Sequence, residues 1–150
     1  MIEFKNVSKV YPNGAVALKN VNINIEKGEF VFIVGSSGAG KSTFLKLIMC
    51  EEKPESGDII FNGRNLSKIR KREIPYIRRN MGTVFQDFRL IDHMTVYDNV
   101  AFAMHVVGAS NREIKKRVPY ICGLVGLEKK MNLMNFPAAN SSVLAWQERL

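Results

Sequence analysis

The chain has 150 residues, of which 46% are hydrophobic and 24% charged, and these are ordinary values for one globular domain with a buried core. No apolar run approaches the ~20 residues that span a bilayer, and the N-terminal residues lack the apolar segment of a secretory signal, so we expect any membrane connection to go through a partner or the surface. A net charge of +8 favours acidic partners such as nucleic acid, anionic lipid or a nucleotide.

The N-terminal third begins with two segments of alternating polar and apolar residues, 2–11 and 16–26, separated by the turn residues Pro12-Asn-Gly14. Alternation is typical of half-buried strands, so these segments predict an antiparallel β flap. Tyr11 precedes the turn. From the residues alone, its ring could equally stack on a base or pack on the flap.

A glycine-rich motif lies between two further elements. Residues 30–34 are all apolar and predict a fully buried parallel strand, whereas residues 43–50 contain no helix breaker and predict a helix. Between them, Gly35-Ser-Ser-Gly-Ala-Gly40-Lys41-Ser42-Thr43 fits the pattern of a Gly, four free positions, and Gly-Lys-Ser/Thr. The order strand, glycine loop, helix is the context that this motif requires.

The residue types of the motif suit a polyphosphate. Backbone N–H groups approach crowded phosphate oxygens best where no Cβ intervenes, which explains the glycines, and a helix N-terminus adds further donors. Lys41 would reach the β- and γ-phosphates, and the Ser42 hydroxyl would bind Mg²⁺. The alternative is a glycine-rich turn in an ordinary βα unit, but the context favours binding of a nucleoside triphosphate.

The middle of the chain combines a hairpin, a basic segment and a second apolar run. Residues 58–61 predict a strand closed by Asn62-Gly63, and residues 66–80 are predicted to be helical in part. The basic side chains in this segment favour a solvated face over a nucleic-acid patch, since no nucleic-acid-binding signature accompanies them; they are Lys68, Arg70, Lys71, Arg72, Arg78 and Arg79. Residues 81–85 predict a second buried strand. Gln86, at its end, could reach Mg²⁺ or an attacking water, or could be a loop glutamine in solvent.

The last third is predicted to be helical. Thr95 is a suitable N-cap for a first helix that ends at Gly108, and Ser110 with Glu113 caps a second helix that runs toward Leu124. We interpret the isolated residues His93 and His105 as packing or surface residues, and Cys50 and Cys122 as buried reduced thiols.

Taken together, these motifs resemble those of the ATP-binding subunits of ABC transporters. The matching stretches follow one another in the family's order; they are Tyr11 with Pro12-Asn-Gly14, Gly35 to Thr43, Ser56-Gly-Asp-Ile59 and Val84-Phe-Gln86. The stretch from Met81 to Leu90, followed by His93-Met-Thr-Val-Tyr-Asp-Asn-Val100, resembles the cell-division members in particular.

The resemblance implies an α/β fold: a P-loop NTPase of the ABC type, incomplete here, with an antiparallel β flap and a helical subdomain. It implies that residues 1–137 form the N-terminal part of this ATP-binding domain, with flap and P-loop core in 1–86, the helical subdomain in 87–135, and a divergent tail in 138–150.

The resemblance also assigns roles to single residues. Tyr11 would stack on adenine, and Gln86 would sense the γ-phosphate and contribute to the metal site with Ser42. Lys41 and Gln86 would act in catalysis. The expected ATP contacts are Tyr11, Gly35, Ser36, Ser37, Gly38, Ala39, Gly40, Lys41, Ser42, Thr43 and Gln86.

Partners and location follow from the same resemblance. It implies ATP and Mg²⁺ as ligands, a membrane partner of the FtsX type, a homodimer in the intact family member, and no nucleic acid. The protein would lie at the cytoplasmic face of the inner membrane, held there by its partner, and would act in bacterial cell division.

The sequence departs from the family after Pro137. Residues 138–150 replace the Leu-Ser-Gly-Gly-Glu-Gln signature, and the apolar strand ending in Asp-Glu and the later switch histidine are absent from the 150 residues. We therefore interpret the chain as a truncated or frameshifted product. An ATP-hydrolysing subunit, a nucleotide-binding module without turnover and a nucleic-acid-associated ATP-binding protein remain as alternatives, in that order.

Overall fold

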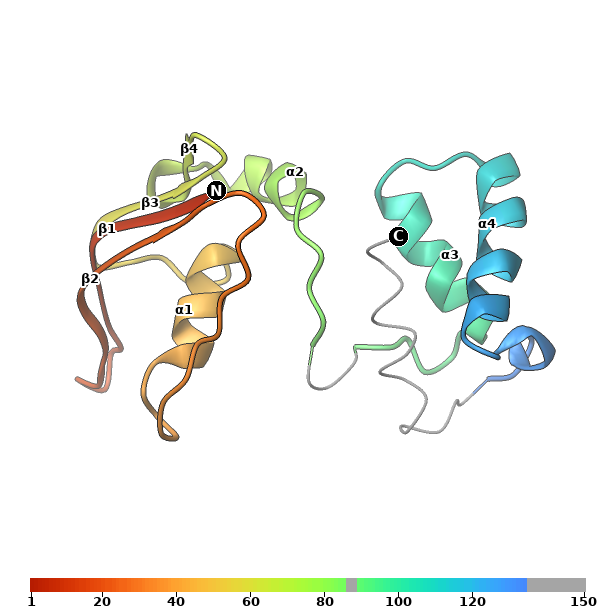
Figure 1. Cartoon of the computed structure of the whole chain (residues 1–150), viewed down its shortest axis with the longest axis horizontal. Coiled ribbons are helices and arrows are strands. Elements are labelled where there is room, and N and C mark those ends of the chain that lie inside the picture. The colour runs from red at the N-terminus through yellow and green to blue at the C-terminus, as the bar shows by residue number, and fades with distance from the viewer. Residues whose placement is uncertain (86–88, 135–150) are drawn as a thin grey trace. The chain divides into compact units, whose positions relative to one another are not determined.

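The computed structural model describes residues 1–85 and 89–134, which fall into two compact units, Met1–Arg78 and a second unit that begins at Arg79. Figure 1 shows the strands in the first unit and the longest helices, α3 and α4, in the second. No helix in the described ranges is long and apolar enough to cross a membrane.

The first unit is an antiparallel sheet covered by a helix (Figure 1). Its strands lie in the order β2-β1-β3-β4, and every neighbouring pair is antiparallel. Their bounds are β1 Ile2–Val10, β2 Val16–Ile25, β3 Ser56–Phe61 and β4 Arg64–Asn65. The predicted β flap is therefore confirmed, as is the hairpin turn at Asn62-Gly63, where both residues have positive φ.

Helix α1, Lys41–Ile48, packs on this sheet through its buried side chains Phe44 and Leu47. The ring of Phe44 stacks on that of Phe4 in β1, with centroids 4.4 Å apart and planes inclined by 16°. Such burial of large apolar side chains is the main stabilising term in a small unit. The core of the first unit is completed by Val7, Ile59, Leu66 and Ile77.

Between the sheet and the second unit, the chain forms short helical turns, as predicted for the basic segment. These are η1 Leu66–Lys68, η2 Lys71–Glu73 and α2 Ile74–Arg78. Ile77 is buried while the lysines and arginines of the segment are exposed, so the segment is amphipathic with a solvated basic side.

The second unit is helical, with α3 at Val96–Val106, α4 at Asn111–Leu124 and a short turn η3 at Glu128–Lys130. Both predicted caps are confirmed: Asp98 N donates to Thr95 Oγ1 over 3.0 Å, and Ser110 and Glu113 form a reciprocal capping box. A shared core packs α3 against α4; it consists of Val96, Ala101, Ile114, Val118, Cys122 and Leu127.

Two strand predictions are wrong. Residues 30–34 and 81–85 belong to no strand among the described residues, and Phe30, Phe32 and Val34 are 82%, 77% and 85% exposed. A parallel strand is stable only with ladder partners beside it and packed layers on both faces. The described sheet is wholly antiparallel and leaves both apolar runs without such partners. The glycine loop therefore follows a segment that belongs to no strand.

Gly57 in β3 offers a test of how closely the strands approach. A Cβ at Gly57 would lie 2.4 Å from Asn6 O and 2.5 Å from Lys5 O, whereas a Cβ at Gly63 would meet nothing within 4 Å; both glycines have positive φ. We expect Gly63→Ala to lower the free energy of unfolding by about 1 kcal/mol, from backbone strain alone. Gly57→Ala should lower it by about 3 kcal/mol or more, because strand contact adds to that strain. Urea unfolding followed by circular dichroism measures both, and equal losses would contradict the close approach.

Candidate functional site

The glycine loop leads directly into α1, and its backbone fixes the start of that helix. Ala39 N donates to Ser36 O over 3.2 Å to close a turn, and Phe44 N donates to Gly40 O over 2.8 Å to begin the helix. Gly38 and Gly40 have φ values of 80° and 87°, in the region that only glycine adopts at no cost. The residues of the loop from 35 to 39 are all exposed.

Gly40 is also required by packing. A Cβ at this position would lie 2.3 Å from Ala17 O and 3.0 Å from a methyl group of Leu18, both in β2. The start of α1 therefore rests directly on the backbone of β2, and only a residue without a side chain permits this approach. The glycine that the motif demands serves both the loop and the sheet.

The N-terminus of α1 is well suited to an anion. Gly40 provides no side-chain cap, and the first turn contains no acidic residue. The first N–H groups of a helix have no intrahelical partner, and the helix dipole adds positive potential at the same point. An uncapped helix start next to a glycine loop is thus a ready site for phosphate oxygens.

Lys41 lies over the loop to which it belongs. Its Nζ donates to Gly35 O over 2.8 Å and to Ser36 O over 2.6 Å. The ammonium group is therefore held within the span of the loop by two backbone carbonyls, which are neutral acceptors. Anionic phosphate oxygens are stronger acceptors for an ammonium group, so a polyphosphate in the loop could replace these bonds.

The other residues predicted to contact ATP differ in how far they are exposed to solvent. Ser36, Ser37, Ala39 and Ser42 are exposed, so their backbone or hydroxyl groups are accessible to a ligand. Thr43 is only 7% exposed and faces the protein interior instead. The Ser42 hydroxyl offers the hard oxygen that Mg²⁺ prefers. Within the described residues no group of three or more His, Cys, Asp or Glu side chains could hold a metal by itself.

Tyr11 comes directly after β1 and is joined to the start of α1. Its hydroxyl lies 3.1 Å from Thr43 Oγ1, so the aromatic ring is tied to the third residue of the motif helix. The turn after it is closed by two backbone bonds, Tyr11 N to Ala15 O and Gly14 N to Tyr11 O, each 2.9 Å. The structure therefore places Tyr11 in the same unit as the glycine loop, with its hydroxyl beside Thr43, while its stacking on adenine stays a prediction.

Lys9 is a neighbour of the site that the sequence analysis did not single out. Its Nζ lies 5.5 Å from the centroid of the Tyr11 ring and 3.1 Å from a carboxylate oxygen of Glu52. Lys9 precedes Tyr11 by two positions near the end of β1, and this spacing is the sequence signal that could have drawn attention to it. Its partner Glu52 could not have been found in that way.

Gln86, the other predicted catalytic and metal-binding residue, lies outside the described residues. The structure therefore brings together Tyr11 and the loop with its helix, while the placement of Gln86 relative to them stays a prediction.

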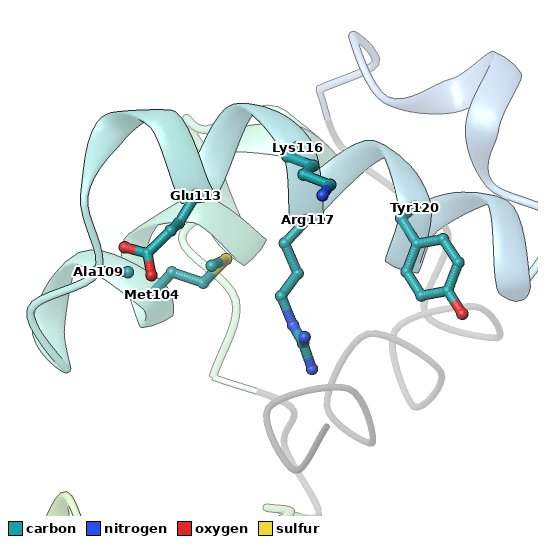
Figure 2. A pocket seen from close by; sticks show the side chains of 6 residues that line it. All are labelled: Met104, Ala109, Glu113, Lys116, Arg117 and Tyr120. Carbon is teal, nitrogen blue, oxygen red and sulfur yellow. The ribbon is translucent and has the colours of Figure 1, made fainter.

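The helical unit contains a groove whose character differs from that of the glycine loop. Figure 2 shows this groove of about 630 Å³, lined by Met104, Ala109, Glu113, Lys116, Arg117 and Tyr120. Hydrogen bonds from the side chain and backbone of Ser110 hold the pKa of Glu113 below its ordinary value. The groove contains none of the residues predicted to contact ATP, so the glycine loop remains the candidate site.

Comparison with known proteins identifies the family. Residues 18–146 match the family model described as ABC transporter. The chain is 52% identical over 130 residues to the cell division ATP-binding protein FtsE of Bacillus subtilis (strain 168), a match that covers 87% of this chain and 57% of that protein. It is 44% identical to the methionine import ATP-binding protein MetN of Helicobacter pylori (strain ATCC 700392 / 26695), over 88% of this chain and 40% of that protein.

Solved structures agree with this. A dimeric ATP-binding cassette in a post-hydrolysis state, bound to ADP and Pi, superposes with a TM-score of 0.88 at 35% identity, covering 100% of this chain and 69% of the other. The family resemblance inferred from the motifs, and with it the α/β P-loop NTPase fold class, is therefore confirmed. The chain spans less than two thirds of the length of the curated relatives named above.

The bond between Tyr11 and Thr43 leads to a prediction. Tyr11→Phe removes the hydroxyl but keeps the ring, and leaves the buried Thr43 hydroxyl without this partner. We expect the free energy of unfolding to fall by about 1 kcal/mol. Tyr120→Phe, at a position that is 64% exposed, is the matched control and should change stability little. Chemical denaturation of both variants measures the difference; equal stability would show that the bond contributes nothing.

Proposed function

The chain belongs to the ABC transporter family, and we propose that it is the ATP-binding part of an FtsE-like complex that couples ATP to a membrane partner in bacterial cell division. The observation that carries the proposal is the geometry of the glycine loop: positive φ at Gly38 and Gly40, an uncapped start of α1, and the Lys41 ammonium over the loop.

Within this proposal, each group has a defined task in binding. The loop N–H groups and the N-terminus of α1 surround the phosphates, and Lys41 exchanges its two carbonyl bonds for phosphate oxygens. The Tyr11 ring stacks on adenine, while its hydroxyl remains bonded to Thr43. Mg²⁺ would be held by the Ser42 hydroxyl together with Gln86, and would neutralise charge on the phosphates.

Hydrolysis requires more than these groups. In-line attack on the γ-phosphate needs a residue that positions and activates the water and a complete metal shell. The 150 residues contain neither an Asp-Glu pair nor the Leu-Ser-Gly-Gly-Glu-Gln signature. We therefore propose that this chain binds ATP with little or no turnover, and that ATP hydrolysis is the property of the intact family member.

Partners follow from the similarity to FtsE. We propose a membrane partner of the FtsX type, association with the cytoplasmic face of the inner membrane through that partner, and head-to-tail pairing of two ATP-binding domains in the intact protein. The similarity to MetN favours a second candidate, an ATP-binding subunit of an importer. Co-purification with an FtsX-type or an importer-type membrane subunit would distinguish the two.

ATP binding is tested by exchanging one lysine of α1 at a time. We expect Lys41→Met to weaken the binding of Mg·ATP at least tenfold, because a hydrogen bond to a charged group contributes about 1.5–3 kcal/mol. Lys46→Met, on the exposed side of the same helix, is the control and should bind as the natural chain does. Isothermal titration calorimetry measures both; equal affinities would contradict the proposed site.

Turnover is tested on the same variants. We expect phosphate release by the natural chain to be no faster than release by Lys41→Met, measured on protein of confirmed mass. Release that disappears with Lys41→Met would show true ATPase activity and would overturn the proposal of binding without turnover.

A further inference from the structure

We propose that Lys9 is a positioning residue for the base of the nucleotide, acting through the Tyr11 ring. The inference rests on the proposed function, since it concerns the same ATP site. It adds a residue that determines where the Tyr11 ring lies relative to the glycine loop.

The environment of Lys9 is unusual for a lysine on a small protein. Its side chain is only 12% exposed, and its Nζ donates to Lys53 O over 2.9 Å and pairs with Glu52 Oε2 at 3.1 Å. The Tyr11 ring lies 5.5 Å away, within the range of a cation–π interaction. Two oxygens and an aromatic face thus surround a group that has three donors and no acceptor.

The partners of Lys9 belong to the segment that follows α1. Glu51 N and Glu52 N both donate to Lys46 O, over 2.9 and 3.3 Å, so this segment is attached to the last turn of the helix. Through Glu52, Lys9 is therefore connected to the C-terminal end of α1. The ion pair is partly buried on both sides, with Glu52 33% exposed, and is screened less by salt than a surface pair.

The Tyr11 ring is connected to the opposite end of the same helix. Its hydroxyl bonds to Thr43, in the first turn of α1, while its ring lies beside the Lys9 ammonium. Each of these groups therefore contacts the next: Tyr11 contacts α1, α1 contacts the segment with Glu52, Glu52 pairs with Lys9, and Lys9 lies beside the Tyr11 ring. Because the glycine loop is continuous with α1, these contacts fix the Tyr11 ring relative to the loop proposed to bind phosphate.

This geometry suits recognition of a base. An ammonium group over one face of a ring leaves the opposite face for a stacked partner, and the ring must be held still for stacking to contribute to affinity. The Lys9 charge is paired with Glu52, whereas the Lys41 ammonium, among the residues that the structure describes, bonds two neutral carbonyls of the loop. The structure thus assigns the two lysines different tasks: Lys41 acts on the phosphates and Lys9 acts on the base through Tyr11.

The test compares a ligand that has a base with one that lacks it. Binding of Mg·ATP and of inorganic tripolyphosphate is measured by calorimetry for the natural chain and for Lys9→Met, which keeps the length of the side chain and removes its charge. We expect affinity for ATP to fall about five- to tenfold, by loss of the interactions that orient the ring. Affinity for tripolyphosphate should stay unchanged. Lys5→Met, which removes an exposed ion pair with Glu3 on the same strand, is the control.

A double-mutant cycle distinguishes action through Tyr11 from an independent effect. If Lys9 acts through the ring, Lys9→Met should add nothing to the loss caused by Tyr11→Ala. Lys9→Arg should restore part of the affinity for ATP because it keeps the charge. If Lys9→Met does not fold, Glu52→Gln provides the same test, since it removes the charge that holds Lys9 in place, and should weaken ATP binding selectively.

Each remaining outcome overturns a defined statement. Equal losses for ATP and tripolyphosphate would show that Lys9 supports the loop or the fold in general, and additive losses in the cycle would show that it does not act through Tyr11. Unchanged ATP affinity would exclude any role in binding. Failure of the natural chain to bind either ligand would instead refute the proposed function itself.

Discussion

The first unit depends on how closely α1 approaches the sheet. The Phe4–Phe44 stack fixes the helix against β1, and Gly40 lets its first turn rest on the backbone of β2. Because the glycine loop is continuous with this turn, packing of the hydrophobic core also sets the position of the backbone of the candidate site. The geometry of the candidate site therefore depends on the packing of the core. A substitution that loosens the core should alter the site even when it replaces no residue of the site.

The candidate site relies more on backbone groups than on charged or polar side chains. Most of its donors are backbone N–H groups whose direction is fixed by the φ values of Gly38 and Gly40 and by the start of α1. The side chains that matter are held by neutral groups or by other charges: Lys41 by the carbonyls of its own loop, and Lys9 by Glu52. The loop backbone is thus shaped by glycine conformations and by the start of α1, whereas the Lys41 ammonium would have to release its two carbonyl bonds to meet an anion.

Features that depend on residues close together in the sequence were predicted well. Features that depend on residues far apart in the sequence were not. The caps at Thr95 and Ser110 and the turn at Asn62-Gly63 each depend on residues within a few positions, and all three are confirmed. The two apolar runs at 30–34 and 81–85 carry strong β patterns, but a strand needs partners, and hydrophobic content alone does not supply them. The glycine loop was found because its pattern is contiguous. The environment of Lys9 was not predicted, because the carbonyl that it binds, on Lys53, is 44 positions away.

The exposed segment 30–34 also bears on the fate of the chain in a cell. It is a run of five apolar residues, uncharged and free of proline, with aromatic rings at Phe30 and Phe32. Segments of this composition are the ones that chaperones and proteases engage and that seed intermolecular cross-β assembly. Within the part of the chain that the structure describes, the segment 30–34 is therefore a place where intermolecular strand pairing could begin.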